Sequence, residues 1–287
     1  QAVQQGADFV VGPLTKKDVV TIAQTQLTVP TLALNSTQDS GEQRVNNLYQ
    51  FDLSPTSEAM QAATRGRQHN LSHAVVFALP AEWSQNIAKA FQQQWKSEGG
   101  RVVQVVTVQN TQQIDAAIRQ LMHAQVVENP GIGQAHYKLA HQADFDLVFL
   151  ATSAAQARQV VPLLRFYYNG YLPIYATSLI YDGSGGTLGN SDLNGISFCG
   201  MPWVIQPSIS LNNSLLTIRN NTQSLWSSSF SHTPKLYAVG VDAYNLIPEL
   251  NKLVILPELG MSGATGRLFL NDNHTVYRQL QWAEIHN

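Results

Sequence analysis

The sequence has very little cysteine and little charge. Cys199 is the single cysteine among 287 residues, which excludes an intrachain disulfide and any metal site built from several cysteines. Charged residues make up 13% of the chain, and 17 Lys and Arg against 19 Asp and Glu give a formal net charge of −2. Lysine and arginine are scattered along the chain, whereas a nucleic-acid-binding surface needs a basic face. We therefore expect no nucleic-acid partner.

Long apolar runs are also absent. No stretch approaches the roughly 20 residues that cross a bilayer, so the sequence predicts a soluble chain. The first six residues resemble the last turn of a helix that ends at Gly6. We therefore expect this chain to be a fragment of a longer protein, so that its lack of a signal peptide says nothing about its location.

Motifs for catalysis or cofactor binding are missing as well. The glycine-rich run Gly183–Gly189 lacks the spacing of either phosphate-binding loop, and no G-x-S-x-G nucleophile elbow occurs. His136 and His141 are five residues apart, which separates them by about 140° on a helix and argues against a shared metal. Asp144 and Asp146 flank the start of a strand, where we expect them to cap it. We therefore predict that the chain is not an enzyme and has no catalytic residues, no metal and no cofactor.

A strand, a turn and a helix stand together near the start of the chain. Asp8–Val11 is a short apolar run, Gly12 and Pro13 interrupt it, and Thr15–Ala23 has the polar start and apolar spacing of a helix. In an open α/β sheet, such a turn places helix N-terminal N–H groups at the carboxyl end of a strand, where ligand clefts form. This stretch is therefore either one wall of a cleft or an ordinary connection between a strand and a helix.

Strands and helices then alternate along the chain. A stripe of Trp83, Ile87, Phe91 and Trp95 recurs every four residues, and we expect it to face the core. Repeated alternation is typical of an α/β protein with mostly parallel sheets. Apolar runs predict strands at 29–34, 48–53, 74–79, 102–108, 146–151 and 172–176, and helices are predicted to begin near 55, 83, 114 and 153.

The pattern changes after residue 200. Two consecutive helices are predicted at 215–230 and 236–253, and a closing hairpin of 267–270 with 277–285 is predicted to turn at 271–273. The stretch 128–143 has no clear period and is interpreted as a surface insertion. Two parallel sheets with late helices and a final antiparallel pair indicate two lobes between which the chain passes several times. This is the architecture of bilobed binding proteins.

Short motifs along nearly the whole chain carry a family resemblance. Gly6–Leu14 with Val19, followed by Leu32–Asn35, resembles one lobe of the type I periplasmic binding proteins, the fold of branched-chain amino-acid receptors. Further motifs, in the same order and spacing, resemble the C-terminal domain of penicillin-binding-protein activator lipoproteins of the LpoA type. They are Leu53–Ala59, Tyr175–Ser178, Leu236–Tyr244, and Gly263–Gly266 with Leu280–Trp282.

The resemblance implies a function in peptidoglycan synthesis, cell-wall growth and cell shape. It implies a lipoprotein on the periplasmic side of the outer membrane that docks on a class A penicillin-binding protein and stimulates its transpeptidase activity. The lipidated cysteine that anchors such a protein in the membrane, a helical-repeat N-terminal domain and the first βα units of the fold are absent from this fragment. The resemblance does not indicate which surface meets the synthase.

The resemblance also divides the chain into two lobes. The family's lobes correspond to residues 1–53 with 204–256, and to residues 54–203 with 257–287. The fold expected is a two-lobed, type I binding-protein-like α/β fold with helices flanking parallel sheets. Family members vary in length over residues 109–143, so no functional residue is assigned there.

Related amino-acid receptors bind their ligand with residues that follow the strands, and these positions can be carried over to this chain. The set lacks an acid for an α-ammonium group and an arginine for a carboxylate, and a buried charge without partners costs several kcal/mol. This favours protein binding over solute capture, and a receptor for a small amino-acid-like or amide ligand is the alternative. The cleft candidates are Leu14, Thr15, Asn35 and Thr37 in one lobe and Thr152, Ser153 and Ser178 in the other.

Overall fold

The chain folds into two compact units. The computed structural model describes residues 3–37, 44–107, 110–127, 136–139, 143–168, 170–181, 191–205 and 207–286. Unit 1 comprises Gln1–Ser54 and Gly200–Gln281, and unit 2 comprises Pro55–Cys199 and Trp282–Asn287. The chain therefore passes between the two units three times.

Unit 1 is built on a six-stranded sheet in the order β1-β2-β3-β13-β12-β11. The first four strands in this order are parallel, and β12 and β11 are antiparallel to their neighbours. Every residue of β2 and β3 is buried, which is typical of strands that are covered on both faces. The strands are β1 (Val10–Val11), β2 (Thr31–Ala33), β3 (Leu48–Phe51), β11 (Met261–Ser262), β12 (Arg267–Leu270) and β13 (Thr275–Gln279).

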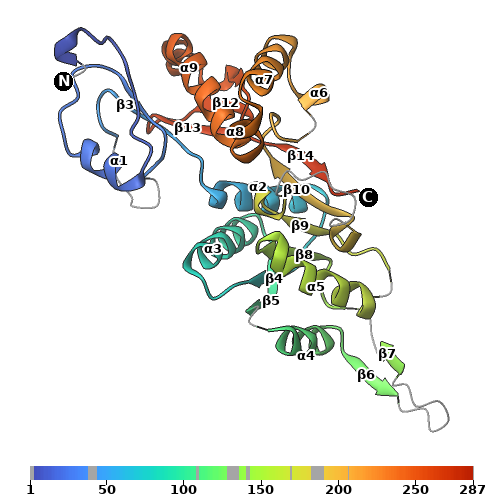
Figure 1. Cartoon of the computed structure of the whole chain (residues 1–287). Coiled ribbons are helices and arrows are strands. Elements are labelled where there is room, and N and C mark those ends of the chain that lie inside the picture. Colours follow the sequence, from blue (N-terminus) through green and yellow to red (C-terminus); the bar gives the residue numbers. More distant parts are fainter. Residues whose placement is uncertain are drawn as a thin grey trace. The chain divides into compact units, whose positions relative to one another are not determined.

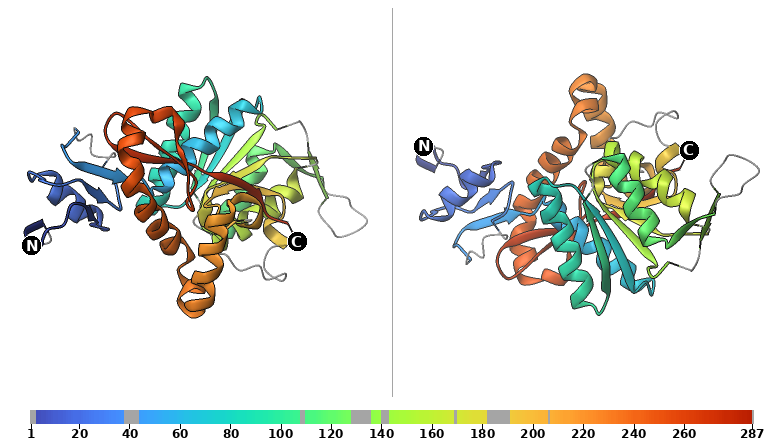
Figure 2. Two further views of the ribbon diagram at one scale, coloured as in Figure 1. Left: turned by 90° about the horizontal axis from the view of Figure 1, so that it is seen from above. Right: turned by 90° about the horizontal axis from the view of Figure 1, so that it is seen from below.

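The long helix α9 (Pro234–Ile255) supplies much of the core of unit 1. Ala238, Leu246 and Leu250 are buried at helical spacing on one of its faces, in one cluster with apolar residues of the sheet. The helices α7 and α8 stand out from this sheet (Figure 2). The remaining helical segments of unit 1 are η1 (Val3–Gln5), α1 (Lys16–Ala23), α6 (Pro207–Ser210), α7 (Asn213–Leu225), α8 (Ser227–His232) and η5 (Pro257–Leu259).

Unit 2 contains a second six-stranded sheet, in the order β14-β10-β9-β8-β4-β5. The strands from β10 to β5 in this order are parallel. All five residues of β8 are buried, whereas β5 lies at the edge of the sheet and is mostly exposed. The strands are β4 (His73–Ala78), β5 (Arg101–Thr107), β8 (Leu147–Ala151), β9 (Ile174–Ala176), β10 (Ile196–Gly200) and β14 (Gln281–Glu284).

Helices accompany this sheet, and a two-stranded hairpin extends from it (Figure 1). The helices are α2 (Pro55–Gln68), α3 (Glu82–Ser97), α4 (Thr111–Leu121), α5 (Ala154–Tyr167), η3 (Ser178–Ile180) and η4 (Ser191–Leu193). The hairpin joins β6 (Ala124–Val127) and β7 (His136–Leu139). These alternating strands and helices confirm the predicted α/β class. No helix in the described part of the chain is both long and apolar enough to span a membrane.

The predicted core stripe on α3 is confirmed except at its first position. Ile87, Phe91 and Trp95 are buried, and the rings of Phe91 and Phe149 stack with centroids 4.1 Å apart. Trp83 is 41% exposed, so its predicted place in the core is wrong. It lies in the first turn of the helix, where Ser84 is the buried residue instead.

The end of the chain differs from the prediction. The residues after the turn form two strands, β13 and β14, and only β13 pairs with β12. Because β13 also pairs with β3 and lies in the sheet of unit 1, the predicted assignment of residues 257–281 to the second lobe is wrong. Most of the predicted insertion 128–143 and all of Gly183–Gly189 lie outside the described residues.

Candidate functional site

The first turn of unit 1 is stabilised by its own polar side chains. Thr15 caps α1, because its Oγ1 accepts the N–H of Asp18 at 3.3 Å and donates to the Asp18 Oδ2 at 2.6 Å. The Asn35 Nδ2, which follows β2, donates to the carbonyl oxygen of Leu14 at 3.1 Å. The structure therefore brings Leu14 and Asn35 together, and their contact fixes two neighbouring loops.

Thr37 has a different partner. Its backbone N–H and its hydroxyl both donate to the Oε1 of Gln50, at 2.7 and 3.0 Å, and its side chain is buried. The Gln50 side chain therefore takes the place that a ligand acceptor would have. Gln50 lies on β3, and no motif in the sequence pointed to it.

In unit 2, the candidates follow the carboxyl ends of β8 and β9. The Ser178 N–H and hydroxyl donate to the Glu58 carboxylate at 2.7 and 3.1 Å, and both residues are buried. The Ser153 hydroxyl is hydrogen-bonded to the Gln156 side chain. Thr152 is fully buried, and its hydroxyl has no partner in the described part of the chain. Glu58 was missed as a site residue, although it lies in one of the motifs that carry the family resemblance.

The seven candidates thus do not form one uniform set. The structure joins Leu14 to Asn35, and it pairs Thr37 with Gln50 and Ser178 with Glu58. Hydrogen-bonding atoms that already have protein partners are less available to a solute. A ligand role for these residues stays a prediction.

Asp242 connects two of the motifs that carry the resemblance. This fully buried carboxylate on α9 accepts the N–H groups of Ala264 and Thr265 at 2.6 and 2.7 Å, and the Thr265 hydroxyl at 2.7 Å. Burial raises the pKa of Asp242 above its ordinary value, and the three hydrogen bonds oppose that rise. A Cβ atom on Gly263 would lie 2.6 Å from the Asp242 Oδ2, so only glycine fits. These motif residues support the fold.

The acidic residues weighed as metal ligands or catalysts have local roles. Asp146 accepts the backbone N–H groups of Ser72 and His73 at 2.8 Å. Asp144 lies 3.4 Å from the His123 Nε2 at an exposed position. No cluster of three or more His, Cys, Asp or Glu suited to a metal ion occurs among the residues that the structure describes.

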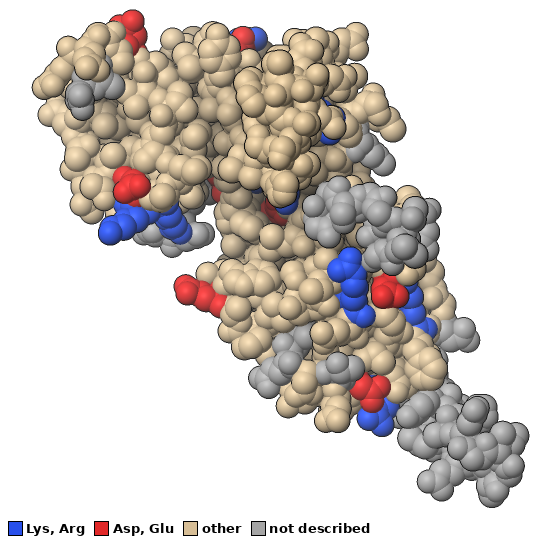
Figure 3. Space-filling model, in the orientation of Figure 1, with Lys and Arg blue, Asp and Glu red and all other residues tan. Residues whose placement is uncertain are grey.

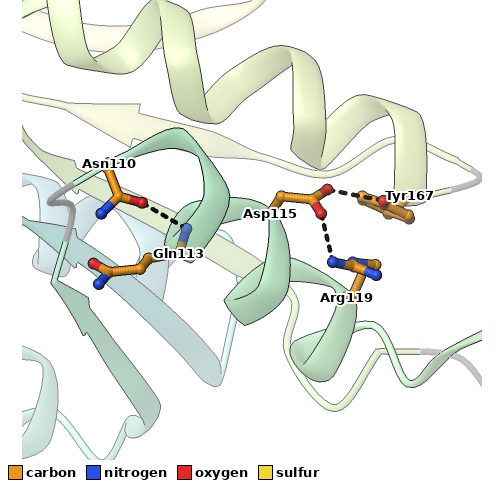
Figure 4. Close-up of polar contacts among 5 residues, drawn as sticks. All are labelled: Asn110, Gln113, Asp115, Arg119 and Tyr167. Atoms are coloured by element: carbon orange, nitrogen blue, oxygen red, sulfur yellow. Dashed lines mark hydrogen bonds and ion pairs between the residues drawn. The ribbon is translucent and has the colours of Figure 1, made fainter.

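A further polar cluster joins α4 to α5 (Figure 4). Asp115 accepts a hydrogen bond from the Tyr167 hydroxyl at 2.9 Å and forms an ion pair with Arg119 at 2.8 Å. Asn110 caps α4, because its Oδ1 accepts the N–H of Gln113 at 2.9 Å. These contacts tie two helices together and leave no group directed toward a ligand.

A hollow of about 500 Å³ lies in unit 1, between α7 and α9. This volume is within the range of about 300–1,000 Å³ typical of binding pockets, which are mostly apolar with a few polar groups. The sequence analysis had interpreted the two helices only as part of the fold. The lining residues are Ile218, Thr233, Leu236, Tyr237, Gly240, Val241, Tyr244 and Asn245.

Comparison with known proteins identifies the family. The model of the LppC lipoprotein family matches residues 1–287. This chain belongs to the LppC lipoprotein family. The Penicillin-binding protein activator LpoA of Photobacterium profundum is 27% identical over 291 residues, which cover 97% of this chain and 46% of that protein. The LpoA of Vibrio antiquarius is 26% identical over 307 residues, covering 98% and 47%. The chain therefore spans about half the length of these relatives.

Solved structures show the same fold. The C-domain of Haemophilus influenzae LpoA, described as a regulator of PBP1A, has a TM-score of 0.76 at 23% identity. The match covers 100% of this member of the LppC family and 82% of that domain. The leucine-binding protein LivK of Thermotoga maritima matches with a TM-score of 0.58 at 15% identity, over 100% of this chain and 79% of LivK. The family resemblance and the type I binding-protein-like fold predicted from the sequence are confirmed.

Proposed function

We propose that this chain binds a class A penicillin-binding protein and stimulates its crosslinking of peptidoglycan. The observation that carries the proposal is the match to a protein named penicillin-binding protein activator over 97% of this chain. The Haemophilus influenzae domain with the same fold is described as a regulator of PBP1A, which is a further support. The site of action in this proposal is the periplasmic side of the outer membrane, in keeping with membership of a lipoprotein family.

The activator acts as a binding partner and performs no catalysis itself. A protein stimulates an enzyme when it binds the enzyme's active arrangement more tightly than the inactive one. A tenfold shift in that equilibrium requires a preference of about 1.4 kcal/mol, which a modest interface can supply. The internal hydrogen bonds of Thr37 and Ser178 support this function over solute capture, because those groups are already satisfied.

Direct binding tests this proposal. The chain and the cognate class A penicillin-binding protein are mixed, and their association is followed by sedimentation velocity. We expect a saturable complex. In parallel, thermal shift with a panel of free amino acids and small amides measures solute binding. A solute that raises the melting temperature of a chain that forms no complex would contradict the activator function and support a receptor.

A further inference from the structure

The helix α9 is apolar on two sides, and only one of them is covered by the sheet. Its buried side includes Ala243 and Leu246. On the other side, Leu236 is 56% exposed and Tyr244 is 75% exposed. A helix that is apolar all round is normally enclosed on all sides. The exposed side of α9 therefore lacks the covering that its sequence is suited to.

The hollow between α7 and α9 lies along this exposed side. Leu236, Gly240 and Tyr244 line it at intervals of four residues, with Ile218 of α7 opposite. Gly240 keeps the floor open, because a Cβ atom at this position would have no neighbour within 4 Å. From Thr233 to Asn245 the lining follows about 18 Å of helix, at a rise of about 1.5 Å per residue. That length accommodates three turns of a second helix.

One wall of the hollow is held in place by contacts within unit 1. The Tyr237 hydroxyl lies 2.6 Å from the Ser229 Oγ of α8. The Tyr237 ring stacks on Trp226, with centroids 6.4 Å apart, and contacts Phe230 with centroids 5.6 Å apart. These contacts fix the ring before any partner arrives, and binding to a fixed wall loses less conformational entropy.

The surface around the hollow carries almost no charge. Residues 207–248 include only three charged side chains, namely Arg219, Lys235 and Asp242. Asp242 is buried, and Arg219 donates to the Trp203 carbonyl and to Gln223 at 2.8 and 3.1 Å. Figure 3 likewise shows few charged side chains over the helical part of unit 1. A neutral wall is complementary to a neutral, apolar partner surface, and it offers nothing to an anionic ligand.

The side chains in the hollow favour a polypeptide over a glycan strand. Sugars present many hydroxyl groups, and each of these needs a hydrogen-bond partner when it is buried. The lining is mainly aliphatic and aromatic, and the Thr233 hydroxyl already donates to the Ser229 carbonyl at 2.9 Å. Apolar side chains spaced three and four residues apart on a helix match this lining, in the helix-in-groove mode of recognition.

We propose that the hollow between α7 and α9 receives the neutral, apolar face of an amphipathic helix of the class A penicillin-binding protein. This inference rests on the proposed function, because it names the surface through which that function is exerted. Tyr244 and Leu236 are the side chains that anchor the incoming helix, and Gly240 makes the room for it.

Two substitutions test the surface in the complete chain. Gly240→Met fills the hollow, and Tyr244→Ala removes an anchor. We expect each variant to bind the cognate penicillin-binding protein at least about tenfold more weakly, as is typical of central interface residues. Tyr171→Ala is the matched control, since Tyr171 is an 81% exposed tyrosine of unit 2. We expect it to bind as the parent does, and all three variants to keep the melting temperature of the parent.

The outcomes separate this inference from the proposed function. If the parent binds and both groove variants bind equally well, the groove is not the docking surface, although the proposed function stands. If the folded parent itself neither binds nor stimulates, the proposed function fails and this inference fails with it. A loss of binding in the groove variants alone supports both.

A photocrosslinking residue at position 244 identifies the occupant. We expect the crosslink to map to a helix of the penicillin-binding protein that has a neutral, apolar face. A crosslink to a strand or loop would overturn the helix assignment. Saturable binding of purified glycan strands that Gly240→Met abolishes would also overturn it.

Discussion

Gly263 and Gly240 lie in very different surroundings, although both belong to motifs of the same family. A Cβ atom on Gly263 would lie 2.6 Å from a buried Asp242 oxygen, whereas one on Gly240 would meet no atom within 4 Å. We expect Gly263→Ala to lower the free energy of unfolding by about 1–3 kcal/mol, because the buried carboxylate must move. Gly240→Ala serves as the matched control and should raise it by about 0.5–1 kcal/mol through helix propensity. Urea unfolding measures both, and equal effects would contradict this account.

Asp242 gives the stability of the protein a specific dependence on pH. Burial raises its pKa above the ordinary value of 3.8, so the folded state holds this proton to higher pH than the unfolded chain. Its contribution to stability is therefore complete below that ordinary value and is lost as the pH rises through the folded pKa. Asp242→Asn does not titrate, so we expect the stability of the parent relative to this variant to fall between about pH 4 and pH 7.

Urea unfolding of the parent and of Asp242→Asn at the two pH values measures this difference. A relative stability that rises with pH would mean that the three hydrogen bonds from Ala264 and Thr265 outweigh the burial of the carboxylate.

At the scale of single elements, the cap of α4 contributes to the stability of unit 2. The Asn110 Oδ1 accepts the N–H of Gln113, so Asn110→Ala leaves that donor without its partner. We expect a loss of about 1 kcal/mol of unfolding free energy. Ser153, at the start of α5, makes no such bond to the backbone, so Ser153→Ala should cost less. Equal losses in chemical unfolding would contradict this assignment of the caps.

The two tryptophans of α3 provide a second comparison within one element. Trp95 is fully buried, stacks on Phe91, and its Nε1 donates to the Arg101 carbonyl at 3.1 Å. We expect Trp95→Ala to lower the unfolding free energy by about 3–5 kcal/mol. Trp83→Ala should have a far smaller effect, because that side chain is 41% exposed. Thermal unfolding distinguishes the two, and a similar loss in both would place Trp83 in the core.

Sequence periodicity predicted the elements better than it predicted their partners. The spacing of Ile87, Phe91 and Trp95 indicates a buried helix face because helical geometry itself produces it. The pairing of β13 with β3 joins Thr275 to Gln50 across more than 200 residues, and no local pattern contains it. This long-range pairing is why the assignment of residues 257–281 was wrong.

At the scale of the whole molecule, the candidate cleft residues show the same limit. Their polar types and their places after strands are visible in the sequence. Their partners are not, since Ser178 pairs with Glu58 from 120 residues away. Whether a polar side chain at a strand end faces a ligand or its own protein is decided by such tertiary contacts. The order of the family motifs, which extends over the whole chain, was therefore the more informative signal for function.

Stimulation of peptidoglycan crosslinking is the most direct test of the central claim. The transpeptidase activity of the cognate class A penicillin-binding protein is measured on its natural substrate as this chain is added. The account predicts that crosslinking rises and saturates with the same concentration dependence as binding, and that Gly240→Met shifts both curves together. Binding without any rise in crosslinking, or neither with a correctly folded chain, would contradict it.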